Sequence, residues 1–192
     1  TLLTQFRFIK KDKKLKKVLV FYRSSQFSEA IAETKSRLVI EKVEVMAVDL
    51  DKEGKEDFQN YFKENGIKVI KESKADAVWV MLDSGLLTKE IFTSFWLPSS
   101  QELSIPFVAG VESFVNPEMN FALFGMSPNL QDLAGQAVQM IQGILEDGST
   151  CTKVGVEDLI GVNKFLNGVK AKSSKFEFEE ADLVTSEVKV KN

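Results

Sequence analysis

Five short apolar runs alternate with longer stretches of helical periodicity through the middle of this chain. The runs are rich in β-branched and aromatic residues and cover 18–22, 43–48, 77–82, 106–109 and 121–124. Runs that are apolar throughout are typical of strands buried on both faces, and their alternation with helices is typical of βαβ units. Because such connections are short and right-handed, we expect a three-layer αβα sandwich with a mostly parallel five-stranded sheet in the order 2-1-3-4-5.

The expected helices have recognisable start and stop residues. Ser127 followed by Pro128 is a typical start, after which apolar residues recur every three or four positions as far as Leu145, with Gly148 as the stop. An extended run is expected over 154–162 and a short helix over 163–169. The other expected helices start at Ser25 or Ser28, run from Phe58 to near Gly66, and run from Leu86 to Trp96 with Pro98 as the stop.

Composition excludes several classes of enzyme. The chain has no His, which removes the commonest general base at neutral pH and the commonest zinc ligand. Cys151 is the single cysteine, so an intramolecular disulfide and a two-cysteine racemase are excluded as well. These absences argue against catalysis, and we expect a protein that is not an enzyme.

Charge is distributed unevenly along the chain. The net charge is −3, yet residues 1–17 carry +6 and the remainder −9. A body with this acidic balance argues against a nucleic-acid partner. Lysines are concentrated from Lys10 to Lys17 and could contact anionic lipid or nucleic acid, but a hydrated entry segment is the simpler interpretation. The sequence predicts no membrane-spanning segment and no signal peptide, and its start at Thr1 suggests a processed form or an excised segment.

Candidate site residues lie in the loops that follow the expected strands. In a doubly wound sheet these loops meet at one edge, where ligands bind. Their hydroxyls, backbone N–H groups, guanidinium and carboxylates predict a binding edge for a small polar molecule. The expected ligand-binding residues are Arg23, Ser24, Ser25, Asp83, Ser84, Gly110, Glu112, Gly125 and Ser127.

Other interpretations of the same loops remain open. The serines could simply cap helices, and Asp83 could be a turn residue. Asp83 and Glu112 could form an acid–base pair, or Asp83 could bind Mg²⁺ together with Asp49 or Asp51. The sequence contains neither a GxGxxG nor a GxxxxGK[ST] motif, so we expect no dinucleotide cofactor and no P-loop.

A series of motifs follows in order over roughly 165 residues from Lys16 to about Val184, in the segments 15–25, 75–83, 105–112, 124–137 and 158–164. This order resembles that of the tryptophan/tyrosine-type substrate-binding proteins of ABC transporters. The likeness departs from the family at Asn120-Phe121, where Gly-Ala is usual, and at 127–129, where tyrosines are often found.

The resemblance implies one lobe of an extracytoplasmic solute-binding protein that holds a small polar solute, such as an amino acid, by hinge closure. The implied partners are an ABC permease and a first lobe of the same protein, with the full-length protein periplasmic or lipid-anchored. It implies a basic entry or hinge segment at 1–16, a Rossmann-like lobe at 17–150 and a returning C-terminal segment at 151–192. Two alternatives are a free-standing sensory or interaction domain of the same fold and a Mg²⁺-dependent enzyme built on Asp83 and Glu112.

Overall fold

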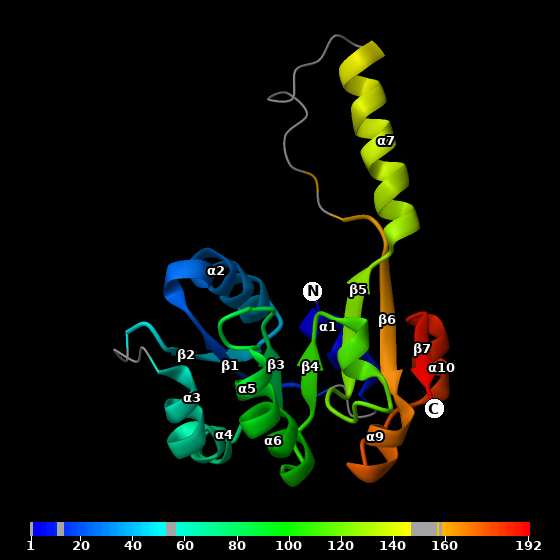
Figure 1. Cartoon of the computed structure of the whole chain (residues 1–192). Coiled ribbons are helices and arrows are strands. Elements are labelled where there is room, and N and C mark those ends of the chain that lie inside the picture. The colour runs from blue at the N-terminus through cyan, green and yellow to red at the C-terminus, as the bar shows by residue number, and fades with distance from the viewer. Residues whose placement is uncertain (1, 11–13, 53–56, 147–156, 158) are drawn as a thin grey trace.

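A computed structural model describes residues 2–10, 14–52, 57–146, 157 and 159–192 and shows a seven-stranded sheet in the order β2-β1-β3-β4-β5-β6-β7 (Figure 1). The first five strands are parallel, β6 is antiparallel to β5, and β7 is parallel to β6. The predicted order 2-1-3-4-5 is confirmed, and the predicted count of five is corrected to seven because the C-terminal residues add β6 and β7. The strands are β1 Lys17–Tyr22, β2 Glu44–Asp49, β3 Ala77–Val80, β4 Phe107–Ala109, β5 Phe124–Pro128, β6 Val162–Asn167 and β7 Val188–Lys191.

Helices cover both faces of the sheet, so the architecture is the predicted αβα sandwich. One face packs against α3 to α6 and the other against α1, α2, α9 and α10. Strand side chains alternate between the two, as in β1, where Leu19 and Phe21 face one core and Val18 and Val20 the other. The α-helices are α1 Leu2–Ile9, α2 Ser24–Ile40, α3 Phe58–Tyr61, α4 Ile67–Ser73, α5 Lys89–Ile91, α6 Leu97–Glu102, α7 Leu130–Glu146, α9 Gly168–Ser173 and α10 Glu180–Thr185.

The larger core is built on aromatic side chains. Phe62 stacks on Phe95 with ring centroids 4.4 Å apart, and the Phe21 ring meets Phe62 edge-on at 5.2 Å. Trp96 is fully buried beside them, and its indole N–H donates to the Leu86 carbonyl at 2.8 Å. Buried aromatic pairs of this kind hold the helices firmly on the sheet.

Two helices extend past their predicted ends because each contains a π-helical turn. Turn η1, Phe62–Gly66, joins α3 to α4, so the helix continues beyond Gly66 to Ser73. Turn η2, Phe92–Trp96, joins α5 to α6, and Pro98 lies in the first turn of α6 instead of ending the helix. A widened turn disrupts the ordinary i→i+4 bonding, which allows a proline directly after it.

The fifth strand and the helix after it lie further along the chain than predicted. Residues 121–123 precede β5, which runs through Ser127 and Pro128 and pairs with β6 over its whole length. Only Phe124 and Gly125 also pair with β4. Pro128 is therefore tolerated where β5 has one neighbour, and α7 starts at Leu130 instead of Ser127.

The predicted helix over 163–169 is wrong, since β6 occupies Val162–Asn167. Its helical signal belongs to α9, whose cap is Asn167: the side chain accepts from the Lys170 N–H at 2.8 Å. The predicted stop at Gly148, the residue Cys151 and residues 154–156 and 158 of the predicted extended run lie outside the described residues. Of the part of that run that the structure describes, only Val162 belongs to a strand. Among the helices described, none is long and apolar enough to cross a bilayer.

Candidate functional site

An ion pair joins the loops that follow β1 and β3. Arg23 Nε donates to Asp83 Oδ2 at 2.8 Å, and its Nη2 donates to Oδ1 of the same carboxylate. Asp83 is 1% exposed, and its Oδ1 also accepts from the Gly85 N–H at 2.8 Å. The hydrogen bond that Arg23 donates to Asp83 is the main reason that the pKa of Arg23 lies above its usual value, so the guanidinium stays charged.

Gly85 is required by this geometry. A Cβ added at this position would lie 2.7 Å from the Arg23 Cζ, closer than atoms in contact can approach. The absence of a side chain therefore lets the guanidinium lie flat over the loop. The Arg23 guanidinium also lies 5.8 Å from the centre of the Phe58 ring, which covers it from α3.

The Arg23–Asp83 pair lies where the strand order reverses, between β1 and β3. The chain runs from β1 outward to β2 on one side and then returns to β3 on the other, so α2 and α5, the helices that follow β1 and β3, pack on opposite faces of the sheet. In doubly wound sheets this crevice at the carboxyl ends is where ligands bind. Arg23 and Asp83, which the sequence assigned to one edge, are indeed in direct contact there.

Two aspartates at the carboxyl end of β2 extend this edge: Asp49 is its last residue and Asp51 follows it. Asp49 accepts from the Ser24 N–H at 3.2 Å and Asp51 from the Ser25 N–H at 2.7 Å, so both carboxylates bind the first turn of α2. Burial disfavours the charged form of Asp49, but hydrogen bonds from Ser24 outweigh it and lower the pKa of the carboxyl. The backbone bond from Ser25 lowers the pKa of Asp51. Ser24 and Ser25 therefore bind these carboxylates through both backbone and side chain at the start of α2.

The loop after β3 contributes an apolar contact that the sequence did not indicate. The strand ends at Val80, two residues earlier than predicted, so Leu82 lies in the loop and is 50% exposed. Its side chain lies beside Gly110, 3.5 Å from where a Cβ would be. Ser84 is exposed next to Asp83. Because Leu82 belongs to an unbroken apolar run, its sequence pattern is indistinguishable from that of a strand interior.

The remaining predicted residues do not join the Arg23–Asp83 pair. Glu112 Oε1 is 2.7 Å from Lys191 Nζ, at the far end of β7. The Lys191 ammonium also lies 4.9 Å from the centre of the Phe165 ring of β6, so Glu112 is engaged on the side of β6 and β7. Gly125 is buried inside β5, where a Cβ would lie 2.5 Å from Val115 Cγ2, and Ser127 pairs with Asn163 of β6.

Metal binding finds no support in this arrangement. Asp83 is occupied by Arg23 and Glu112 by Lys191, so they do not form an acid–base pair. Within the described ranges, no group of three Cys, Asp or Glu side chains is arranged to hold a metal ion.

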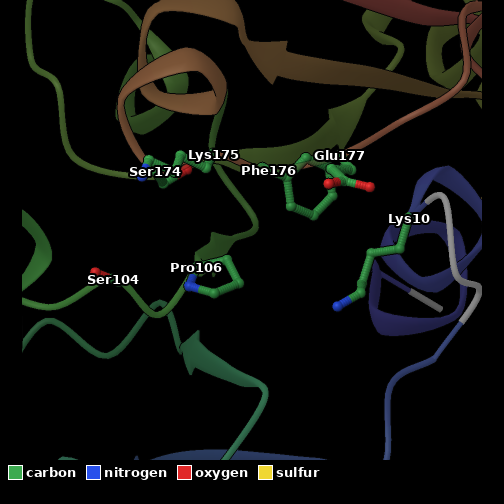
Figure 2. A pocket seen from close by; sticks show the side chains of 7 residues that line it. All are labelled: Lys10, Ser104, Pro106, Ser174, Lys175, Phe176 and Glu177. Atoms are coloured by element: carbon green, nitrogen blue, oxygen red, sulfur yellow. The ribbon is translucent and has the colours of Figure 1, made fainter.

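A cavity of about 300 Å³ lies at the opposite end of the sheet from the ion pair. Figure 2 shows Phe176 and Pro106 bordering this space, with Lys10 on its other side. Pro106 directly precedes β4, so the cavity opens at the amino ends of the parallel strands, where doubly wound sheets do not usually bind ligands. A second cavity, of about 490 Å³, lies between the start of α7 and β6.

Two solved structures resemble this chain. An ABC domain in complex with L-Trp from Streptococcus pneumonia has a TM-score of 0.65 and 16% identity, over 98% of this chain and 61% of that chain. The ligand-free, open structure of CD0873, a substrate-binding protein with adhesive properties from Clostridium difficile, has a TM-score of 0.61 and 17% identity, over 87% of this chain and 52% of that one.

The chain therefore spans about half to three fifths of the length of these binding proteins. No protein-family model matches the sequence, and no curated protein matches it. At these identities the likeness shows the fold alone, which this chain shares with both structures.

Proposed function

We propose that this chain is one lobe of a solute-binding protein, which holds a small polar solute such as an amino acid at the carboxyl edge of its sheet without changing it chemically. The observation that carries the proposal is the Arg23–Asp83 pair at the crevice between β1 and β3. A charged group fixed at this crevice is what a site for a polar solute needs.

Arg23 has donors to spare for a solute. Asp83 engages Nε and one N–H of Nη2, which leaves Nη1 and the second Nη2 hydrogen beyond that contact. The Arg23 side chain is 22% exposed, so these donors can reach a molecule at the edge. A guanidinium held in place by a buried carboxylate is already oriented, and it suits the carboxylate of an amino acid. Exposed Leu82 offers an apolar contact nearby.

The wider role that we propose is capture of the solute outside the cytoplasm and its delivery to an ABC permease. The L-Trp complex of one structural neighbour supports the choice of an amino acid as the first solute to test. Hinge closure of two lobes converts weak contacts at each edge into a cleft that excludes water. One lobe supplies only part of those contacts, and we expect the chain by itself to bind weakly.

Calorimetric titration of the chain with L-amino acids, L-Trp first, tests this proposal. We expect dissociation constants of about 1 mM or weaker for this chain, and micromolar values for the protein encoded by the complete gene. Micromolar binding by the 192-residue chain would contradict the single-lobe assignment, and no binding by the complete gene product would contradict the proposed function.

Arg23→Lys provides the matched variant, because it keeps the positive charge but removes the planar fork. In the complete gene product we expect it to weaken solute binding by about 10- to 100-fold, which corresponds to the loss of a charged hydrogen bond. Arg37→Lys is the control: Arg37 lies on α2, exposed and paired with Glu33, and should leave affinity unchanged. Equal effects of the two variants would remove Arg23 from the site.

A further inference from the structure

The amino edge of the sheet, where the parallel strands begin, carries a concentration of lysines. Lys14 and Lys16 lie just before β1, and both are exposed. Lys42 lies between α2 and β2, Lys74 lies between α4 and β3, and both are also exposed. We call the following set the basic edge: Lys10, Lys14, Lys16, Lys42, Lys74 and Lys175.

The Asp76 carboxylate connects two segments of the basic edge. It lies two residues after Lys74 and accepts from the backbone N–H groups of Lys16 and Lys17 at 2.7 and 2.9 Å. Because these donors lie at the start of β1, Lys16 and Lys74 belong to adjacent loops.

The ends of α1 and α9 extend the basic edge. Arg7 Nη1, in the last turn of α1, donates to the carbonyl of Glu41, next to Lys42, at 3.1 Å. Lys10 follows α1 and lines the cavity of about 300 Å³ together with Lys175, which follows α9. Figure 2 shows the Lys10 side chain extending into this space. Lysines from separate parts of the chain therefore share one edge of the sheet.

The carboxylates near this edge leave the lysines in excess. Glu41 pairs with Arg7 at 3.5 Å. Glu44 pairs with Lys17 at 3.3 Å. Glu177 is the acidic residue that lines the cavity, where two lysines accompany it. The basic edge therefore keeps an excess of positive charge within a chain whose net charge is −3.

The backbone makes lysine an unusual residue at three of these positions. Lys42, Lys74 and Lys175 have φ of 59°, 50° and 53°, in the left-handed region that glycine and asparagine usually occupy after a helix. The helix dipole favours a cation there, yet Glu187 occupies the equivalent position after α10, with φ of 54°. Because β7 is antiparallel to the first five strands, Glu187 lies toward the carboxyl edge, where it lines the second cavity with Asn129. The sign of the charge therefore follows the edge of the sheet and not the helix end.

The side chains of the basic edge fit a lipid surface better than a nucleic acid. Phe8, two residues before Lys10, is 54% exposed. Lysines beside an exposed aromatic ring are typical of proteins that bind the interface of an anionic bilayer. Lysine lacks the planar fork by which arginine recognises the phosphates and bases of nucleic acids. The charge of −9 on the residues after 17 would also repel an extended polyanion, whereas a flat surface meets one edge alone.

We propose that the basic edge binds the surface of an anionic phospholipid bilayer, with Phe8 entering the headgroup region. The Arg23–Asp83 pair lies at the opposite end of the sheet, so a chain bound in this way turns its carboxyl edge away from the lipid. That consequence for a solute rests on the proposed function, whereas the contact with lipid requires no solute.

Co-sedimentation of the 192-residue chain with vesicles, without solute, tests the proposal. The vesicles contain phosphatidylcholine alone or phosphatidylcholine with about 30% phosphatidylglycerol, in about 0.1 M NaCl. We expect binding to the anionic vesicles to be at least about 10-fold tighter than to the neutral ones, and to weaken at least about 10-fold in about 0.5 M NaCl. Equal binding to both kinds of vesicle, or binding to neither, would overturn the proposal.

A triple variant, Lys42→Gly with Lys74→Gly and Lys175→Gly, removes three charges at positions whose backbone suits glycine. We expect it to keep the circular dichroism spectrum of the parent, because glycine adopts a positive φ without strain. Its binding to the anionic vesicles should weaken by about 100-fold, or roughly 5-fold for each lysine.

The matched control is a second triple variant, Lys52→Gln with Lys63→Gln and Lys89→Gln. It lowers the net charge by the same amount at exposed positions outside the basic edge, and we expect it to bind the anionic vesicles nearly as tightly as the parent. Equal weakening in the two triple variants would contradict the proposal, because total charge and not the basic edge would then determine binding.

A Phe8→Trp variant places a fluorescent reporter at the lipid contact. Compared with the parent, which contains Trp79 and Trp96, we expect its emission to shift to shorter wavelength on the anionic vesicles and not on a DNA duplex. Binding of the parent to the duplex but not to the vesicles would assign the basic edge to nucleic acid and exclude lipid. Binding to the vesicles without a shift would overturn the insertion of Phe8.

Discussion

The body of the sheet and helix α7 use the same kinds of side chain in opposite surroundings. In the body, Phe62 and Trp96 lie within a cluster of aromatic rings and are almost inaccessible to water. In α7, Val138 and Ile141 are more than half exposed. The helix has a regular apolar periodicity, yet nothing in the described chain covers it. Periodicity therefore tells which face of a helix needs a partner, and the tertiary structure alone tells whether the partner is in the same chain.

Truncating one side chain in each region should give the largest difference in the free energy of unfolding. Trp96→Ala removes an indole at the centre of the aromatic core together with its hydrogen bond to Leu86, and we expect it to lower the free energy of unfolding by about 3–5 kcal/mol. Ile141→Ala on α7 should change it by less than about 0.5 kcal/mol, because an exposed side chain loses little. Urea denaturation of the 192-residue chain measures both. A decrease in the free energy of unfolding of more than about 2 kcal/mol for Ile141→Ala would show that the apolar face of α7 is already covered.

Alanine in place of a glycine should change stability in opposite directions in the body and in α7. At Gly66, in the π-helical turn η1, an added Cβ would lie 2.3 Å from Phe95 Cε2. We expect Gly66→Ala to destabilise the chain by about 1–3 kcal/mol, because the stacked ring must move. At Gly143 of α7 no atom lies within 4 Å of the added Cβ, and Gly143→Ala should stabilise the helix by about 0.5–1 kcal/mol. Thermal unfolding of the two variants measures both effects. A Gly66→Ala variant more stable than the parent would contradict the close packing of Gly66 against Phe95.

Much of the fold was predictable from the sequence because buried parallel strands are apolar throughout. The first four strands lie within two residues of their predicted ends, and the order of the first five is confirmed. Strand β5 was misplaced because residues 121–123 are as apolar as a strand and equally buried. The long helices were cut short at Gly66 and Pro98, since a π-helical turn depends on the packing of Phe62 against Phe95 and leaves no local signal.

The candidate site was predictable only where topology determines it. Parallel strands bring the loops after β1 and β3 together, so Arg23 and Asp83 could be assigned to one edge from strand order. Glu112 was assigned to that edge by the same rule, yet its carboxylate pairs with Lys191 and not with a residue of the Arg23–Asp83 pair. That contact depends on β7, a strand beyond the five that the sequence indicated.

Lys170 extends the contrast to charged groups within the body. Its ammonium donates to the Ser100 carbonyl, and burial lowers the pKa of this lysine. Between that lowered value and the ordinary pKa of about 10.4, the unfolded chain binds more protons than the folded one. The free energy of unfolding should therefore rise with pH in this window, by at most about 1.4 kcal/mol per pH unit for one proton.

Lys170→Met should remove this rise. Urea denaturation at several alkaline pH values up to the ordinary lysine pKa of about 10.4 measures the difference. Lys172→Met, on the exposed side of the same helix, serves as the control and should keep the rise. A rise that persists in Lys170→Met would assign the pH dependence to another group.

Replacing Asp51, which is exposed at the carboxyl edge, should have the smallest effect on stability. Hydrogen bonds from Ser25 lower the pKa of Asp51, so its folded state holds the proton less tightly than the unfolded chain. The charge of Asp51 therefore stabilises the folded chain above the ordinary pKa of about 3.9, and this stabilisation is lost as the pH falls through the lowered folded pKa. Asp51→Asn retains an acceptor for the Ser25 N–H but removes the charge at the start of α2. The thermal midpoint should therefore fall slightly at pH 7 and converge with that of the parent as the pH falls through the lowered folded pKa of Asp51. Glu118→Gln, an exposed carboxylate outside this edge, should not reproduce that convergence. A midpoint difference for Asp51→Asn that stays constant from pH 7 to pH 3 would mean that the charge of Asp51 does not stabilise α2.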